Sequence, residues 1–330
     1  MADRGGRPAA MRRSTHHADH VFAVLDDAAL PAQSAVAASW FRSLRHGLDP
    51  ECRLPPRRLD QAEFTHAVEK SGPLVRLAQE SLDRLFLSVG DAGCCVLLTD
   101  REGVPLDRRG KACDDRDFLK LGLWTGMVWD EASEGTNGIG TGLTEGRPLT
   151  IYRDEHFLTR NIGLSCTVAP IRDARGNIVA ALDVSNARKD HTTGVMKLVA
   201  AATYEAAQKI EARCFRETFR NARILLAPDT PRGPGGLIAV DCGDIIFGAS
   251  YAARRAYGLT DAQLGLPVYD VLPLLPGGTP DDDLAAAERG ALQRALSRAQ
   301  GNVTAAAGLL GISRATLHRK ITRLGLSRQP

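Results

Sequence analysis

The sequence lacks the features of an exported or membrane-embedded protein. None of its apolar runs approaches the length of about 18 residues that a membrane-spanning helix needs. Residues 1–20 are polar and arginine-rich, without the apolar core of a signal peptide. Seven cysteines, an odd number scattered over 330 residues, argue against a disulfide framework and for a reducing compartment. We therefore expect a cytoplasmic protein.

The chain also lacks a nucleotide-binding motif. A P-loop requires a lysine preceded by glycine and followed by serine or threonine. The only Gly-Lys pair, Gly110-Lys111, is followed by Ala112, and the position where such a motif would begin holds Pro105. The glycines of residues 135–142 come without that lysine, so they either line a ligand cavity or turn the chain beneath a sheet.

No catalytic or metal-binding constellation stands out. The sequence does not place a nucleophile, a base and an orienting group together, so we do not expect an enzyme, and no cofactor or metal is expected. His16, His17 and His20 have no carboxylate or cysteine framework nearby, which disfavours a metal site there. Residues 1–20 are instead expected to form a disordered basic tail.

The composition is that of an ordinary soluble protein, 44% hydrophobic and 25% charged, with room for two or three domains. Residues 21–73 form a helical segment with a broken apolar stripe. From residue 74 the pattern becomes mixed α/β, and a long helix is expected over residues 192–225. The expected elements between them are a helix at 74–89 and strands at 94–99, 104–106, 149–152, 165–171 and 178–184.

A proline- and glycine-rich stretch at residues 226–236 is expected to be a linker. After it, two short apolar strands at 237–240 and 245–247 flank a turn, and a helix follows at 250–257. The segment 237–280 resembles the opening of a PAS domain but is too short to be a whole one, and it ends in a second linker.

Residues 281–330 have the pattern of a helix-turn-helix preceded by one more helix over residues 283–298. Gly311 ends the first helix of the motif because glycine tolerates positive φ, and Ser313 can cap the second. Small residues let the two helices cross closely. The apolar positions at helical spacing are Val303, Ala306, Ala307 and Leu310 in the first helix, and Leu317, Ile321 and Leu324 in the second.

Charge supports DNA binding by this end of the chain. Residues 284–330 contain eight Lys or Arg and one acid, Glu288, a net charge of +7, whereas the whole chain carries +3 and the remainder therefore −4. The segment closely resembles the Fis-type helix-turn-helix along its whole length. That resemblance, together with position off the apolar seam, implies these DNA-facing residues: Ser313, Arg314, Thr316, His318, Arg319, Lys320 and Arg323.

Among these residues, Arg314 is the candidate for reading guanine, whereas Thr316 and Lys320 are candidates for holding phosphates. His318 departs from the Tyr or Arg that is commoner at its position in the Fis-type motif, which leaves the base preference there open.

Several motifs in the middle of the chain occur in a characteristic order. They are SWFRS at 39–43, GLDP at 47–50, WDEASEGTNGIGTG at 129–142, EHF at 155–157, LSCTVAPI at 164–171 and LDVS at 182–185. Together they resemble the GAF sensor domain of the acetoin-type catabolic regulators over most of residues 35–220. The resemblance implies an α+β multidomain protein: a GAF-like antiparallel sheet flanked by helices at 74–191, a signalling helix at 192–225, and a separate all-α helix-turn-helix.

The same resemblance implies an effector site built from residues 129–166. Its candidate residues are Trp129, Glu134, Thr136, Asn137, His156, Phe157 and Cys166. His156 can be a structural histidine, a ligand contact, or a metal or haem ligand. Cys94, Cys95 and Cys166 can sense oxidation, but packing is favoured because each lies in a strand where a small hydrophobe would serve. Trp124 and Trp129 either wall the pocket or belong to an aromatic core.

The regulators of this type usually carry a sigma-54-interacting ATPase module between sensor and helix-turn-helix, for which this sequence has no room. We therefore expect a transcriptional regulator that binds DNA and a small effector as a homodimer, without its own ATPase, and that acts through RNA polymerase or a full-length relative. The alternative is a redox- or ligand-responsive interaction protein with weak architectural DNA binding.

Overall fold

The structure of the protein, a computed structural model, describes residues 9–25, 34–188, 192–272, 288–296, 299 and 301–324. These residues fall into two compact units, Met1–Val268 and Tyr269–Pro330. In the described part of the chain no helix is long and apolar enough to cross a membrane. Mixed helices and strands in the first unit and helices in the second confirm the prediction of an α+β multidomain protein.

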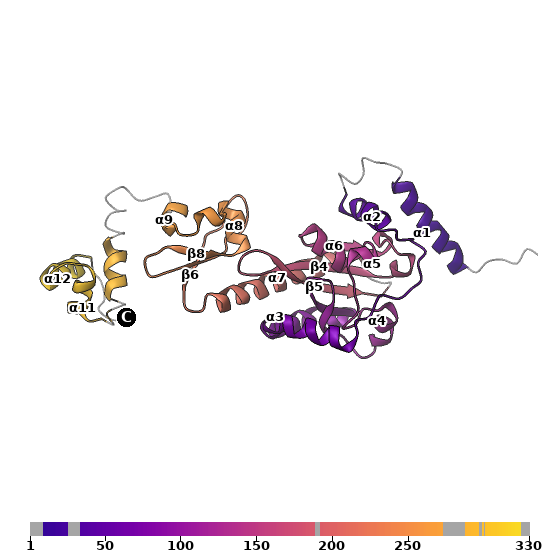
Figure 1. The fold of residues 1–330 in the computed structure, drawn as a ribbon, viewed down its shortest axis with the longest axis horizontal. Coiled ribbons are helices and arrows are strands. Elements are labelled where there is room, and N and C mark those ends of the chain that lie inside the picture. Colours follow the sequence, from indigo (N-terminus) through magenta and orange to yellow (C-terminus); the bar gives the residue numbers. More distant parts are fainter. Residues whose placement is uncertain are drawn as a thin grey trace, which may run out of the picture. The chain divides into compact units, whose positions relative to one another are not determined.

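The first unit is built on a five-stranded antiparallel sheet with the strand order β2-β1-β5-β4-β3 (Figure 1). The central strand β5 pairs with β1 on one side and β4 on the other, so that Ser185 lies between Cys95 and Cys166. All five strands fall where the sequence predicted strands. They are β1 Cys94–Asp100, β2 Pro105–Arg109, β3 Leu149–Tyr152, β4 Ser165–Arg172 and β5 Ile178–Asn186.

Helices cover both faces of this sheet. Alternate residues of β1 point to opposite faces: Val96 and Leu98 pack with α3 and α7, whereas Cys95 and Leu97 pack with α4 and α6. Every residue of β1 is therefore buried. The covering helices are α3 Gln61–Val89 and α7 Thr193–Thr218 on one face, and α4 Asp115–Leu121, α5 Glu131–Glu134 and α6 Gly138–Glu145 on the other.

Helix α3 begins 13 residues earlier than predicted, at Gln61 rather than at residue 74. A capping box fixes its start, because Asp60 accepts the backbone N–H of Glu63 and the Glu63 side chain accepts the backbone N–H of Asp60. Pro73 lies inside the helix, and the turns before it pack against β2. The boundary drawn between residues 73 and 74 was therefore wrong, since it cuts a continuous helix.

The N-terminal prediction also needs correction. Helix α1 spans Ala9–Leu25 and therefore includes residues 9–20, where a disordered tail was expected. The His17 imidazole lies 3.0 Å from the carbonyl oxygen of His156, and Val21 is fully buried in a cluster with Trp40. These partners lie far away in sequence, so local composition did not reveal them. Residues 1–8 of the predicted tail lie outside the described residues. The next helix after α1 is α2, Ala35–Arg45.

Helix α7 ends at Thr218, not at residue 225, and the chain turns into strand β6. This strand joins a three-stranded antiparallel sheet in the order β6-β7-β8. The stretch predicted as a linker closes the β6–β7 connection, with the Ala227 N–H donating to the Gly236 carbonyl (2.8 Å). The linker prediction was therefore wrong for these residues, because they lie inside the first compact unit and join two paired strands. The predicted helix ends early because its last residues pair with β7.

The small sheet is followed by the helix expected at residues 250–257 and by a further short helix that was not predicted. The elements are β6 Arg223–Leu226, β7 Leu237–Val240, β8 Ile246–Ala249, α8 Tyr251–Tyr257 and α9 Val268–Val271. Short 3₁₀ turns occur at Gly90–Ala92, Arg153–Glu155, Thr159–Asn161 and Asp261–Gln263. The second predicted linker, residues 273–280, lies outside the described residues.

Candidate functional site

The second unit contains two short helices around a tight turn, α11 Val303–Leu309 and α12 Arg314–Arg323. Asn302 caps α11 by accepting the N–H of Ala305 (3.1 Å), and Ser313 caps α12 by accepting the N–H of Thr316 (3.1 Å). Between them Gly311 adopts φ +64°, the left-handed conformation that glycine favours. The turn predicted from the sequence is present.

The apolar seam of this unit matches the predicted periodicity. Ala306 and Leu317 are fully buried, and residues 288–296 form a helix that packs on both. The small side chains on α11 let α12 approach closely, as a helix-turn-helix requires. The buried cluster comprises Leu292, Ala295, Leu296, Ala306, Ala307, Leu317 and Ile321.

The seven residues predicted to face DNA differ in how free they are. Arg314, Arg319 and Arg323 are exposed, as is the capping Ser313, whereas Thr316, His318 and Lys320 are half-buried. Glu288 accepts hydrogen bonds from both Lys320 and Arg323, and the Lys320 contact is the main reason that the pKa of Glu288 is lowered. Within the described residues, Arg314 and Arg319 form no ion pair. They are the available cations of α12.

Sequence reasoning had not assigned a role to Glu288. It is the single acid among the basic residues 284–330, and that isolation was the signal that it has a specific partner. Two of the seven predicted DNA contacts are thus already engaged by this carboxylate. A phosphate that binds Lys320 or Arg323 therefore shares these cations with Glu288.

The seven residues predicted to bind an effector are all buried, none more than 3% exposed. Three of them hold the local fold together. The Trp129 indole donates to the Gly122 carbonyl (2.8 Å), the Thr136 hydroxyl to the Ser39 hydroxyl (2.7 Å), and Asn137 caps α6 by accepting the N–H of Gly140 (2.9 Å). Phe157 and Cys166 lie in apolar clusters.

The two titratable members of this set are shifted by burial. Burial raises the pKa of Glu134 to about 7 although Arg160 forms an ion pair with it. Burial also lowers the pKa of His156 to about 4, so the ring is neutral at physiological pH. Its Nδ1 donates to the Arg153 carbonyl (2.9 Å), and its buried Nε2 has no hydrogen-bond partner in the described part of the chain.

Glycines 138, 140 and 142 let α6 lie directly on the sheet. A Cβ on Gly138 would lie 2.6 Å from the Cys166 Cβ, and one on Gly142 would lie 2.3 Å from a Val168 methyl. Gly140 meets the backbone of residues 129–131 in the same way. Close packing of α6 on the sheet therefore explains these three glycines. Gly140 also lines a groove, so the predicted role of the motif in a ligand cavity stays a prediction.

Two further polar groups were not predicted. Asp183 is fully buried on β5, where burial raises its pKa to about 7 and where one carboxylate oxygen accepts from the Ser185 hydroxyl (2.6 Å). Glu131, with its side chain 4% exposed, accepts hydrogen bonds from Arg42 (3.0 Å) and from Ser39 (2.8 Å). These hydrogen bonds to Glu131 connect α2 to α5.

The predicted cysteines behave as core residues. Cys94 packs in the cluster between the sheet and α3, and Cys95 and Cys166 pack on the opposite face. Burial raises the pKa of all three thiols, which keeps them protonated and weakly nucleophilic. In the described part of the chain, no group of three or more His, Cys, Asp or Glu residues is arranged to hold a metal ion.

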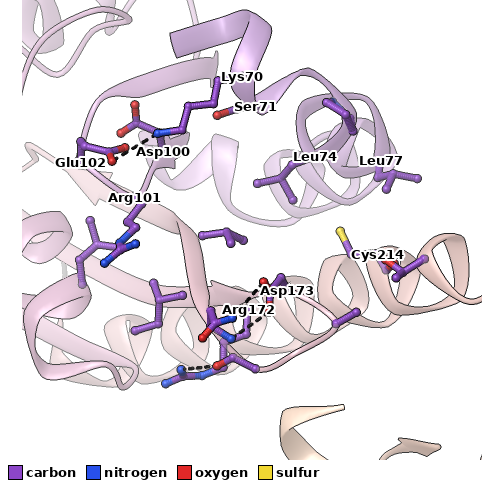
Figure 2. A pocket seen from close by; sticks show the side chains of 18 of the residues that line it. Lys70, Ser71, Leu74, Leu77, Asp100, Arg101, Glu102, Arg172, Asp173 and Cys214 are labelled. Atoms are coloured by element: carbon purple, nitrogen blue, oxygen red, sulfur yellow. Dashed lines mark hydrogen bonds and ion pairs between the residues drawn. The ribbon is translucent and has the colours of Figure 1, made fainter. Parts of the chain in front are cut away.

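A groove of about 1100 Å³ lies beside this core. None of the seven predicted effector residues lines it. Leu74 and Leu77 of α3 face it from one side and Cys214 of α7 from another (Figure 2). Charged side chains form its rim, where Lys70 and Glu102 pair at 3.5 Å. The groove is assembled from α3, the β1–β2 turn, residues 130–131, helix α6, the β4–β5 hairpin and the end of α7. Asp130, Glu131 and Gly140 of the motif at 129–142 line it, but the segments that complete it lie far apart in the sequence.

Two family descriptions match the sequence. "MimR, N-terminal domain" matches residues 8–208, and "Bacterial regulatory protein, Fis family" matches residues 283–329. The first match covers the five-stranded sheet and its helices, and the second covers the helix-turn-helix.

The curated relatives are transcriptional regulators. The acetoin catabolism regulatory protein of Cupriavidus necator is 33% identical over 221 residues, which are 66% of this chain and 33% of that protein. The propane 2-monooxygenase operon transcriptional activator MimR of Mycolicibacterium smegmatis is 29% identical over 233 residues, 69% of this chain and 38% of that protein. The chain thus spans about a third of the length of the curated relatives that it matches.

Among solved structures, the fold is similar to a chain in the crystal structure of the E. coli DhaR(N)-DhaL complex. The TM-score is 0.50 at 17% identity, with 72% of this chain and 80% of that chain covered. This likeness concerns the fold. The family matches and the regulator relatives confirm the resemblance to acetoin-type regulators with a Fis-type helix-turn-helix, and the chain belongs to the family defined by the MimR N-terminal domain.

Proposed function

We propose that this protein is a sequence-specific DNA-binding transcriptional regulator whose N-terminal domain responds to a small effector and which acts without its own ATPase. The observation that carries the proposal is the capped α11–α12 pair, which presents Arg314 and Arg319 from a segment matching the Fis family. Those two guanidiniums are free to meet DNA, and arginine reads guanine through paired hydrogen bonds.

The target proposed for this regulator is a catabolic operon. The relatives are named for acetoin catabolism and for the propane 2-monooxygenase operon, so a small oxygenated or hydrocarbon metabolite is the proposed effector class. A homodimer is also proposed, because one helix-turn-helix reads few base pairs and two half-sites lie about 34 Å apart on one face of DNA.

We assign the effector, as part of this proposal, to the groove between α3 and α7. It has room for a small metabolite, whereas the seven predicted residues are all buried, and Trp129 and Asn137 already hydrogen-bond to the backbone. A contact between those seven residues and the effector stays a prediction. Glu134→Gln tests it. If Glu134 contacts the effector directly, this substitution should weaken the effector response more than it weakens the fold.

The DNA-binding proposal is tested by chromatin immunoprecipitation of the wild type against Arg314→Ala. Loss of one base-reading arginine should lower occupancy of specific sites by about 10- to 100-fold. Arg216→Ala, an exposed arginine on α7, is the matched control and should leave occupancy unchanged. Unchanged occupancy in Arg314→Ala would refute the assignment of α12 as the reading helix.

A salt titration separates this function from weak architectural binding. Promoter and random duplexes should differ in affinity at every salt concentration if α12 reads sequence. A steep salt dependence with equal affinity for both duplexes would support the alternative of an interaction protein that binds DNA through phosphates alone.

The groove assignment is tested with acetoin as the probe. Leu77→Trp narrows the groove, so acetoin should change promoter occupancy by this variant less than by the wild type. Leu87→Trp on the same helix is the control, because Leu87 is 81% exposed and does not line the groove. If both variants keep the acetoin response, the effector binds elsewhere.

A further inference from the structure

A second, smaller pocket lies where the end of β4, the middle of α7 and α8 meet the β6–β7 connection. Its volume is about 170 Å³, close to that of a cavity that holds one benzene molecule. The pocket is built entirely within the first compact unit. Apolar side chains form part of its wall, namely Pro148, Pro170, Ala207, Ala252 and Ala256.

The charged residues of this pocket are unbalanced. Four arginines line it, and Glu211 is the single acid among its lining residues. Burial raises the pKa of Glu211 to about 7, so its negative charge is only partly present at physiological pH. The lining arginines are Arg147, Arg172, Arg232 and Arg255.

Two carbonyls and an aromatic ring hold the Arg172 guanidinium, and the acid that interacts with Arg172 is Glu211, which accepts its backbone N–H (2.8 Å). Its guanidinium donates to the carbonyls of Gly146 (2.6 Å) and Gly176 (3.1 Å) and lies 3.9 Å from the centre of the Tyr251 ring. Carbonyls and an aromatic face orient a guanidinium and leave its full positive charge. The pocket thus has one fixed cation in its wall.

Arg232 and Arg255 complete the positive surface from the other side. Arg255 lies 5.9 Å from the same Tyr251 ring, and Arg232 comes from the β6–β7 connection. Neither guanidinium forms an ion pair with any residue that the structure describes. Both residues line the pocket and are exposed, so their guanidiniums are available to carboxylate or phosphate oxygens, which arginine binds through paired hydrogen bonds.

We propose that this pocket binds a small anion, a carboxylate or a phosphate with few heavy atoms, held by Arg172, Arg232 and Arg255. The volume sets the size of the ligand and the arginines set its charge. The alanine and proline wall accommodates a short apolar tail. Anion binding here does not require DNA binding or the acetoin groove, so each assignment can fail separately.

The test measures thermal unfolding of the full chain with inorganic phosphate or propionate against chloride, at equal ionic strength and pH 7. Saturable stabilisation by either anion is expected. Phosphate alone identifies a tetrahedral oxyanion site, and propionate alone identifies a carboxylate site. The double substitution Arg232→Gln/Arg255→Gln should weaken the apparent affinity by about 100-fold, about tenfold for each charged hydrogen-bond donor.

Two further variants make the outcome decisive. Gln208→Glu adds a carboxylate to the lining and should weaken anion binding while all arginines remain. The control Arg116→Gln/Arg216→Gln removes the same charge from exposed positions outside this pocket and outside the groove, and should bind like the wild type. Equal stabilisation of the wild type and Arg232→Gln/Arg255→Gln, or none by either anion, would overturn the proposal.

Discussion

Replacing Glu288 with glutamine should strengthen DNA binding and make it more sensitive to salt. The substitution raises the net charge of residues 284–330 from +7 to +8 and frees Lys320 and Arg323 from the carboxylate that holds them. Each additional phosphate contact steepens the plot of log affinity against log salt by about 0.9. Two released cations therefore predict a slope steeper by up to about 1.8.

Fluorescence anisotropy of the full chain on a promoter duplex and a random duplex measures this slope between about 50 and about 200 mM salt. The gain should be equal on both duplexes, because phosphate contacts carry no sequence information. Glu205→Gln, which removes one acid from α7 outside the helix-turn-helix, is the control for net charge. An unchanged slope or weaker binding by Glu288→Gln would show that Glu288 positions the two cations for DNA and does not compete for them.

Three predictions concern the buried polar groups and the glycine motif. The pKa of Asp183 is about 7 in the folded protein against an ordinary 3.8, so stability should fall as pH rises between these values. Asp183→Asn should flatten that dependence. Above pH 7 its free energy of unfolding, measured by chemical unfolding, should exceed that of the wild type by about 2–4 kcal/mol. Arg42→Ala leaves the buried Glu131 carboxylate without its cation and should cost about 3–5 kcal/mol, much of it recovered by adding Glu131→Gln; no recovery would contradict this reasoning. Gly138→Ala forces a methyl against Cys166 and should cost about 1–3 kcal/mol in the same assay, and an unchanged midpoint would mean that α6 shifts freely.

The elements that the sequence predicted best are those with a local pattern of apolar residues. The central strands of the large sheet are short apolar runs buried on both faces, and the apolar seam through Leu317 and Ile321 repeats at three to four residues, so each can be recognised without its partner. The family resemblance added the order of the motifs. It located the domain of the five-stranded sheet but not the contacts of its residues.

The parts that were mispredicted depend on partners distant in sequence. Helix α1 is anchored by His17 on carbonyls 139 and 140 residues away, and β6 exists because it pairs with β7. The candidate effector residues are all buried, and their role in binding an effector stays a prediction, because side-chain hydrogen bonds such as that of Trp129 to Gly122 were not visible in the sequence. Cavities joined from several segments leave no spacing in the sequence to recognise.

Three aromatic rings pack at the junction between α7 and the small sheet. Phe219 ends α7, its ring is tilted against that of Phe215 (4.7 Å between ring centres) and meets that of Phe247 edge to face (5.4 Å), and Gly248 provides the space that it needs. We therefore expect a displacement of α7 to be transmitted to the small sheet through these rings. An insertion of glycines after Phe219 should weaken that coupling.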